Sequence, residues 1–478
     1  MLKKYFEING NLVLISLLLA AAAVLAMPYQ LYIIAAVIFF TLTAKFGERF
    51  LITFVIFSYL TIPSDINDFL RILLNIFNIL ILSYLFFQKY GIEFKKYPLV
   101  PKPLMYLFAF TFFTMILSAI MSASLFTGLI EISRTAVFLI IIYYLYSFLS
   151  EDKVAFSYFY AMLISAGIIT FSLFYEFFKS DKFIYLLSTM GYVTLGGFFT
   201  NSTAVGGFLA ITVSITLIYL FIDYKKKHLM LTKIFLLLQV IALLLTNARA
   251  AIAAAIISSL FMLFFTRRKL FKRIFFALII FIPLVFLLQN FNTLIDDYFR
   301  TNRILENTRY YLWDMAFGMI GDHPLLGVGP GMFNHYMYTY LPVAMGSWTE
   351  QQIYVLQQIA AAPAHNFFLM RASEEGVFGL ISAVGIFAIF FSYGFMLIQK
   401  TKNLFYNYHI LSVGIVGIGL GLFARSFFES TGIFTNGWIT RDLPFWLLFA
   451  ILVYMKEIIS ESSQSSELPH QDILSEKS

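Results

Sequence analysis

The sequence predicts an all-α polytopic integral membrane protein with about 12 to 14 transmembrane helices. Of its 478 residues, 60% are hydrophobic and only 12% are charged, and the mean hydropathy is +0.83. An ordinary soluble domain has about 25% charged residues, so this chain has too few charges to cover a globule of its size. Long apolar runs with almost no charge recur along most of the chain. These observations exclude a soluble enzyme, and the absence of cysteine excludes disulfides and thiolate chemistry.

The candidate transmembrane spans are apolar stretches bounded by charged or turn residues. They cover residues 11–27, 29–44, 50–62, 69–88, 103–124, 126–149, 155–178, 204–222, 232–247, 249–265, 274–289, 376–398, 408–424 and 443–455. Several are shorter than the roughly 20 residues that a full crossing needs. The predicted number of transmembrane helices is therefore about 12 to 14. The first span follows two lysines and resembles a signal peptide, but the many spans after it favour a retained first helix.

The lysines orient the chain in the membrane. If the N-terminus is cytoplasmic and the spans alternate, 18 of the 20 lysines lie in cytoplasmic segments, as the positive-inside rule requires. The net charge of +7 therefore reflects membrane topology, and no nucleic-acid partner is expected. We expect both termini to be cytoplasmic.

The spans divide the chain into regions. These are N-terminal transmembrane helices (1–289), a long extracytoplasmic loop (290–375), C-terminal transmembrane helices (376–456) and a polar tail (457–478) that we expect to be disordered. Within the long loop, apolar residues at helical spacing predict an amphipathic helix over Thr308–Ile320. A second helix is expected over Met332–Tyr340, after a glycine-rich stretch.

The arginines are distributed differently from the lysines. Nine of the 13 lie on the outer side or within spans, namely Arg71, Arg134, Arg249, Arg300, Arg303, Arg309, Arg371, Arg425 and Arg441. Positive residues on the translocated side oppose the topology signal, so another function must favour them there. The planar fork of arginine suits bidentate binding of phosphate or carboxylate. The sequence therefore predicts an anionic ligand at the outer face.

Some of these arginines have informative neighbours. Arg249 follows a tight hairpin at the outer water boundary, where it is either a snorkelling side chain or a ligand-binding one. Arg309 and Trp313 lie four residues apart on the predicted amphipathic helix and share a face, either as a packing pair or as a binding surface. Glu131 and Arg134 lie three residues apart inside a span, and we interpret them as an ion pair or, more weakly, as a donor contact.

The end of the long loop contains a candidate base. His365 and Asn366 precede Glu375 and the next span, although an isolated loop histidine is more often structural than catalytic. Two further histidines lie in this loop, but their spacing matches no zinc motif, so no metal site is predicted. The sequence has no phosphate-binding P-loop and no D-x-D pair, so a cytoplasmic nucleotide-sugar donor has no predicted site.

Five motifs occur in a characteristic order between about residues 240 and 380. They are Asn247-Ala248-Arg249, Arg309-x-x-x-Trp313, Asp322-His323-Pro324-Leu-Leu-Gly327-Val-Gly329-Pro-Gly331, His365-Asn366-x-x-Leu369 and Glu375-Gly376. This order resembles the O-antigen ligase and O-antigen polymerase superfamily of bacterial surface-polysaccharide enzymes.

The resemblance implies a metal-independent, inverting glycosyltransferase without a cofactor, in the bacterial inner membrane, with its active site facing the periplasm. Such an enzyme moves a glycan from an undecaprenyl-pyrophosphate carrier to a sugar hydroxyl. By this resemblance, Arg249 and Arg309 would bind the donor pyrophosphate and His365 would be the catalytic base. Further candidates for donor or glycan contacts are Arg303, Arg134, Arg425, Trp313, Asn366 and Glu375.

The acceptor is less defined than the donor. We favour a ligase that uses lipid A–core over a polymerase that uses a second lipid-linked glycan, because of the loop layout and by analogy alone. A transporter of lipid-linked glycans is the third hypothesis. It would more plausibly have ionisable residues near the bilayer midplane and related halves, and the sequence shows few of the former and none of the latter.

Overall fold

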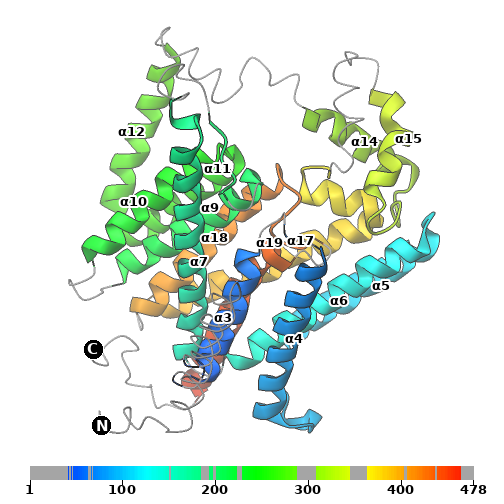
Figure 1. The fold of residues 1–478 in the computed structure, drawn as a ribbon, viewed down its shortest axis with the longest axis horizontal. Coiled ribbons are helices and arrows are strands. Elements are labelled where there is room, and N and C mark those ends of the chain that lie inside the picture. Colours follow the sequence, from blue (N-terminus) through cyan, green and yellow to red (C-terminus); the bar gives the residue numbers. More distant parts are fainter. Residues whose placement is uncertain are drawn as a thin grey trace, which may run out of the picture.

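The described part of the chain is built from helices. The computed structural model describes residues 41–464, except positions 42, 44, 46, 63–65, 67, 150–151, 185–192, 198–200, 223–228, 288–307, 345–362, 403–405 and 436–438. Every regular element within these residues is helical (Figure 1), and nine of the described helices are long and apolar enough to cross a membrane. The prediction of an all-α polytopic membrane protein is confirmed.

The helices follow one another with short connections outside the long loop. Before that loop they are α3 (Glu48–Thr61), α4 (Asp68–Tyr90), the 3₁₀ helix η2 (Phe94–Lys96), α5 (Lys102–Met121), α6 (Leu125–Phe148), α7 (Asp152–Lys179), α9 (Ser202–Phe221), α10 (Leu229–Leu245), α11 (Arg249–Thr266) and α12 (Arg268–Leu287). The loop contributes α14 (Thr308–Asp322) and α15 (Phe333–Ala344), and α17 (Phe367–Thr401), α18 (Tyr406–Ser426) and α19 (Ile439–Gln464) follow.

Most predicted elements coincide with a described helix. Each predicted span from 50–62 onward matches one helix, and α14 and α15 match the two helices predicted in the long loop. The spans predicted at 11–27 and 29–44 lie outside the described residues, apart from positions 41 and 43.

Small residues bring α11 and α18 close together. α18 packs along α11 and against α17, while α9 packs against α10 and α11. A Cβ on Gly421 would lie 2.3 Å from the carbonyl oxygen of Ala254, and one on Gly417 would lie 3.0 Å from that of Ser258. This close approach is the packing that the Gly417 and Gly421 pair predicts.

The glycine-rich loop between α14 and α15 docks on a kink in α17. Gly376 has a φ of +65°, which interrupts the helix, and the next N–H, from Val377, donates to the Pro324 carbonyl at 2.8 Å. Gly327 lies against the same segment, where a Cβ would come within 2.3 Å of the Glu374 carbonyl carbon. The glycines therefore permit contact between two backbones, and this explains the sequence motif without a bound phosphate.

Of two predicted boundaries near the C-terminus, one agrees with the structure and one needs correction. The span predicted from residue 376 starts where Gly376 interrupts α17, and the turns of α17 before this kink carry the buried charged side chains of Arg371, Glu374 and Glu375. α19 continues to Gln464, so the start of the tail predicted as disordered from residue 457 is helical. Glu457 accepts a 2.7 Å hydrogen bond from Tyr146, and Ile459 is buried, which extends the helix.

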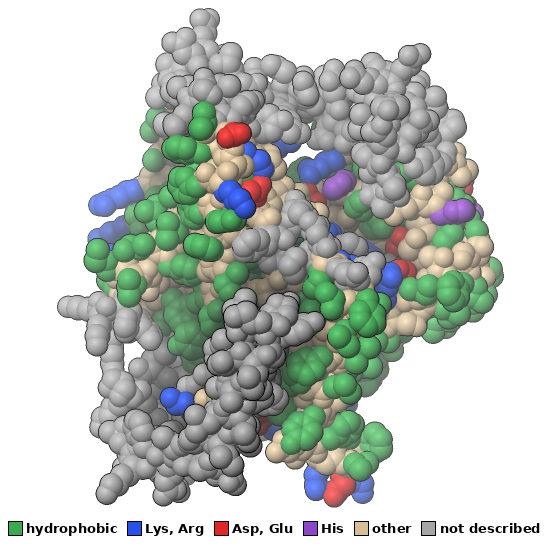
Figure 2. Space-filling model, in the orientation of Figure 1, with side chains coloured by type: hydrophobic (Ala, Val, Ile, Leu, Met, Phe, Trp, Pro, Cys, Tyr) green, Lys and Arg blue, Asp and Glu red, His purple; other side chains and the backbone are tan. Residues whose placement is uncertain are grey.

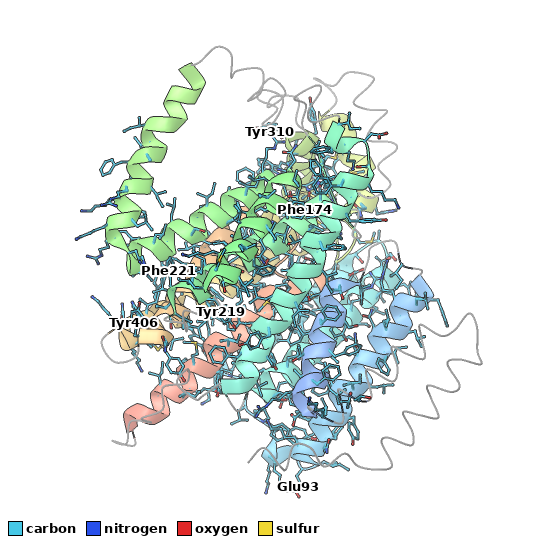
Figure 3. The ribbon with its side chains drawn as sticks, turned by 60° about the vertical axis from the view of Figure 1, so that its left-hand side comes forward. Glu93, Phe174, Tyr219, Phe221, Tyr310 and Tyr406 are labelled. Atoms are coloured by element: carbon cyan, nitrogen blue, oxygen red, sulfur yellow. The ribbon has the colours of Figure 1, made fainter. Side chains whose placement is uncertain are left out.

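Two labelled residues mark opposite ends of the molecule. Figure 3 shows Glu93, beside η2, and Tyr310, on α14, at opposite ends. Figure 2 shows the histidines in the upper right of the face, on the side of α14 and α15, whereas charged side chains lie across the upper half and at the lower tip, with hydrophobic side chains between them. The predicted topology likewise assigns the loop of Glu93 and the long loop to opposite sides of the membrane.

Candidate functional site

A polar pocket lies where the first turns of α9 and α11 meet α14 and the segment after α18. It has a volume of about 190 Å³, and its lining includes Ser202, Thr203, Arg249, Arg309 and Glu429. The N-terminus of a helix carries roughly half a positive charge, and two such ends border this pocket together with two guanidinium groups. One buried carboxylate opposes them, so the pocket favours an anion.

The hairpin between α10 and α11 positions Arg249 as the first residue of α11. Asn247 adopts a φ of +51°, which reverses the chain, and Ala248 follows as the helix cap. The Ala248 N–H donates to the Thr246 hydroxyl at 3.3 Å. A Cβ on Gly206 would lie 2.5 Å from that of Ala248, so this glycine lets α9 approach the hairpin.

Glu429 joins two of the predicted site residues. Its Oε1 lies 2.6 Å from Nη2 of Arg309 on α14, and its Oε2 lies 3.4 Å from Nδ1 of His365. The carboxylate is only 5% exposed, whereas the Arg309 and His365 side chains are 28% and 33% exposed. Three segments distant in sequence are therefore connected through one buried carboxylate.

Glu429 is held in its ionised form. Burial by itself would raise the pKa of this carboxyl, but the hydrogen bond from His365 and the positive charges of Arg425 and Arg309 outweigh burial and lower the pKa below its ordinary value. Because the carboxylate accepts, Nδ1 of His365 carries the proton in this contact, which leaves the lone pair of the neutral ring on Nε2.

The residues around His365 also form the N-terminal cap of α17. His365 has a φ of +47°, which is uncommon for a residue with a side chain. The next residue, Asn366, caps α17 by accepting the N–H of Leu369 at 3.0 Å. Asn366, predicted as a possible glycan contact, is therefore engaged as a helix cap, and this turn fixes the direction from which His365 approaches Glu429.

Arg425 lies behind the pocket and not in its lining. It is buried, and it donates to the carbonyls of Thr431 at 2.6 Å and Thr203 at 3.4 Å. Gly207 leaves room for it, because a Cβ there would lie 2.8 Å from Nη2. Arg425 therefore ties the first turn of α9 to the segment after α18.

The other predicted residues have different surroundings. Trp313 packs on Tyr310 and Phe428, with ring centroids 5.6 and 6.5 Å away. Glu375 forms a buried 2.6 Å ion pair with Arg371 inside α17.

The last two predicted contact residues are Arg134 and Arg303. Arg134 is exposed and pairs with Glu131 at 2.5 Å, as the sequence predicts for these two residues. Arg303 lies outside the described residues. None of Trp313, Glu375 and Arg134 belongs to the described lining of the polar pocket.

Sequence reasoning missed Glu429. One signal was present, because Glu429 is the only acidic residue between Lys402 and Arg441, and it follows Arg425 by four residues. A lone carboxylate beside an arginine at a membrane boundary is expensive to bury and therefore informative. Among the residues that the structure describes, no group of three or more His, Cys, Asp or Glu side chains is arranged to hold a metal ion.

The comparison with known families covers part of this site. Residues 234–384 match the family described as O-Antigen ligase, and this segment includes Arg249, Arg309 and His365, whereas Glu429 and α9 lie outside it. No curated protein matches the chain. The match and the apolar helices indicate a multi-pass membrane enzyme of the O-antigen ligase or polymerase type. The match over residues 234–384 supports the resemblance of the motifs to the O-antigen ligase and polymerase superfamily.

Proposed function

We propose that this protein transfers a glycan from an undecaprenyl-pyrophosphate carrier to a sugar hydroxyl at the outer face of the bacterial inner membrane. The favoured reaction is that of an O-antigen ligase, with lipid A–core as acceptor. The observation that carries the proposal is the link through Glu429, which joins His365 to Arg309 at the wall of a pocket that Arg249 also lines. A candidate base and two candidate anion-binding arginines therefore share one site.

The arginines account for departure of the carrier. When the bond between the anomeric carbon and the pyrophosphate oxygen breaks, negative charge develops on the leaving pyrophosphate. Arg249 and Arg309 and the first turns of α9 and α11 border the space that would hold this charge. Fixed donors of this kind stabilise a transition state without reorganising, and losing one typically costs about 10²–10³ in rate.

His365 accounts for activation of the acceptor. A sugar hydroxyl is a poor nucleophile, and a positioned base typically contributes about 10²–10⁴ in rate. In our proposal, the hydroxyl oxygen attacks the anomeric carbon from the face opposite the pyrophosphate, its proton moves to Nε2 of His365, and the configuration inverts. Glu429 stabilises the imidazolium that forms, because it already accepts from Nδ1.

The direct test uses purified protein, a polyprenyl-pyrophosphate-linked glycan and an acceptor, with no ion gradient. We expect product with wild-type protein, including in the presence of EDTA. His365→Ala should abolish transfer, while His335→Ala, on an exposed loop histidine, should retain it. Full activity of His365→Ala, or product that requires a gradient, would contradict the proposal.

The same assay separates ligase from polymerase. Lipid A–core is supplied in one reaction, and only the lipid-linked repeat in the other. A ligase forms product in the first reaction alone, whereas chain growth in the second assigns the polymerase.

A further inference from the structure

A second pocket lies away from the polar one, between α5, α6 and α19. It has a volume of about 360 Å³, and its lining includes Leu104, Phe108, Phe112, Ala136 and Trp446. Its lining also includes Val100 and Pro101, which follow Glu93 by a few residues in the sequence, and Glu93 lies at the opposite end of the molecule from Tyr310 (Figure 3). The positive-inside rule assigns that end to the cytoplasm.

The lining offers an occupant only hydrocarbon contacts. Its polar atoms are already engaged, because the Tyr143 hydroxyl donates to the Pro98 carbonyl at 3.0 Å and the Trp446 indole N–H donates to the Ile433 carbonyl at 2.6 Å. The Tyr146 hydroxyl donates to Glu457 at 2.7 Å. A sugar or a peptide in this pocket would lose its hydrogen bonds to water without replacement, so the occupant is an apolar chain.

The mouth of the pocket favours an anion. α5 starts there with Pro101 as its N-cap, and no side chain caps the N–H groups of Lys102 and Leu104, which are the ones left at this end because Pro101 and Pro103 have none. Lys102, the first residue of α5, is exposed at the same place, and Lys95 is exposed on η2 just before it, whereas Lys96 pairs with Glu93 at 3.0 Å. An uncapped helix N-terminus and lysines together attract a phosphate.

The length of the pocket matches one leaflet of a bilayer. Between Pro101 and Phe112, α5 rises by about 16 Å, which is close to half of the roughly 30 Å hydrocarbon core. A polyprenyl carrier chain is much longer than one leaflet, whereas a phospholipid acyl chain fits it.

We infer that this pocket binds one phospholipid of the inner leaflet. One acyl chain lies along α5 between α6 and α19, and the headgroup phosphate lies at the N-terminus of α5 beside Lys102. This site is independent of the proposed glycan transfer.

The first test measures the phospholipid that stays with the full-length protein after detergent washing, by mass spectrometry. Ala136→Phe fills the pocket and should remove the retained lipid. Ala109→Phe, on the exposed face of α5 and outside the pocket lining, is the matched control and should keep it. Lys102→Gln should weaken retention about fivefold, the factor that one lysine contributes at an anionic lipid surface. Equal retention in Ala136→Phe and Ala109→Phe would overturn the inference.

The second test places a reporter inside the pocket. The reporter protein keeps Trp446 and has Phe in place of the other three tryptophans. In nanodiscs, phospholipid with brominated acyl chains should quench the fluorescence of Trp446. Introducing Ala136→Phe should abolish the quenching, and Ala109→Phe should not. Unquenched Trp446, or displacement of the brominated lipid by an equal amount of polyprenyl phosphate, would refute a phospholipid site.

Discussion

The guanidinium of Arg309 lies 2.6 Å from the carboxylate of Glu429, although 120 residues separate the two in the chain. The same carboxylate contacts His365 at 3.4 Å. A single buried anion therefore fixes the position of a loop helix relative to the bundle and orients the candidate base. This arrangement makes Glu429 a positioning residue for the proposed reaction.

Replacing Glu429 with glutamine tests this role. The amide keeps the size of the side chain but removes the charge that holds Arg309 and stabilises a protonated His365. We expect the kcat of glycan transfer to fall about 100-fold, with a smaller change in KM for the donor and an altered pH–rate profile. Glu93→Gln, at the opposite end of the molecule, is the control. A Glu429→Gln enzyme with the wild-type rate and pH profile would exclude the role.

Arg249→Lys tests the need for a planar fork at the pocket. Lysine keeps the charge but donates from a single point, so it does not replace two parallel hydrogen bonds to a phosphate. We expect transfer to slow by about 10²–10³, measured as initial rates with purified donor. Arg268→Lys, on the exposed start of α12, should be unaffected. Equal rates for Arg249→Lys and wild type would show that the fork is not used.

The lowered pKa of Glu429 predicts how its contribution to stability depends on pH. Burial opposes ionisation, but the hydrogen bond from His365 and the nearby arginines bring the folded-state pKa below the ordinary value of 4.5. The ionised carboxylate therefore stabilises the folded state above pH 4.5, and this contribution is lost as the pH falls through the folded-state pKa. We expect the difference in Tm between wild type and Glu429→Gln to be constant near neutral pH and to shrink in acid. A difference that grows in acid would contradict the assignment.

Gly376→Ala tests the contact between the glycine-rich loop and α17. A Cβ there would lie 2.2 Å from the carbonyl carbon of Leu325, and the φ of +65° is unfavourable for alanine. The left-handed conformation alone costs about 1–2 kcal/mol, so we expect a lower Tm and less folded protein. Gly321→Ala is the matched control, because nothing lies within 4 Å of its Cβ. If both variants melt at the wild-type temperature, the proposed backbone packing is wrong.

The sequence alone predicts the membrane fold, because the length of an apolar stretch and its lack of charge can be read from consecutive residues. It also predicts the helices of the long loop, the Glu131–Arg134 pair and the Gly417–Gly421 packing, since each depends on residues three or four apart. The motifs around Arg249, Arg309 and His365 likewise predict the family.

Contacts between distant segments required the tertiary structure. Glu429 lies 64 residues after His365, and no spacing rule links them, so its place beside His365 and Arg309 depends on how α14, α17 and α18 pack. The first turns of α17 carry charged residues, so hydropathy alone does not predict a membrane helix there. Glu375 is nevertheless buried, because Arg371 pairs with it and the loop backbone packs beside it. Local patterns determined which helices form, whereas the pairing of charges across the bundle was decided by packing, because a buried charge is stable only where a partner meets it.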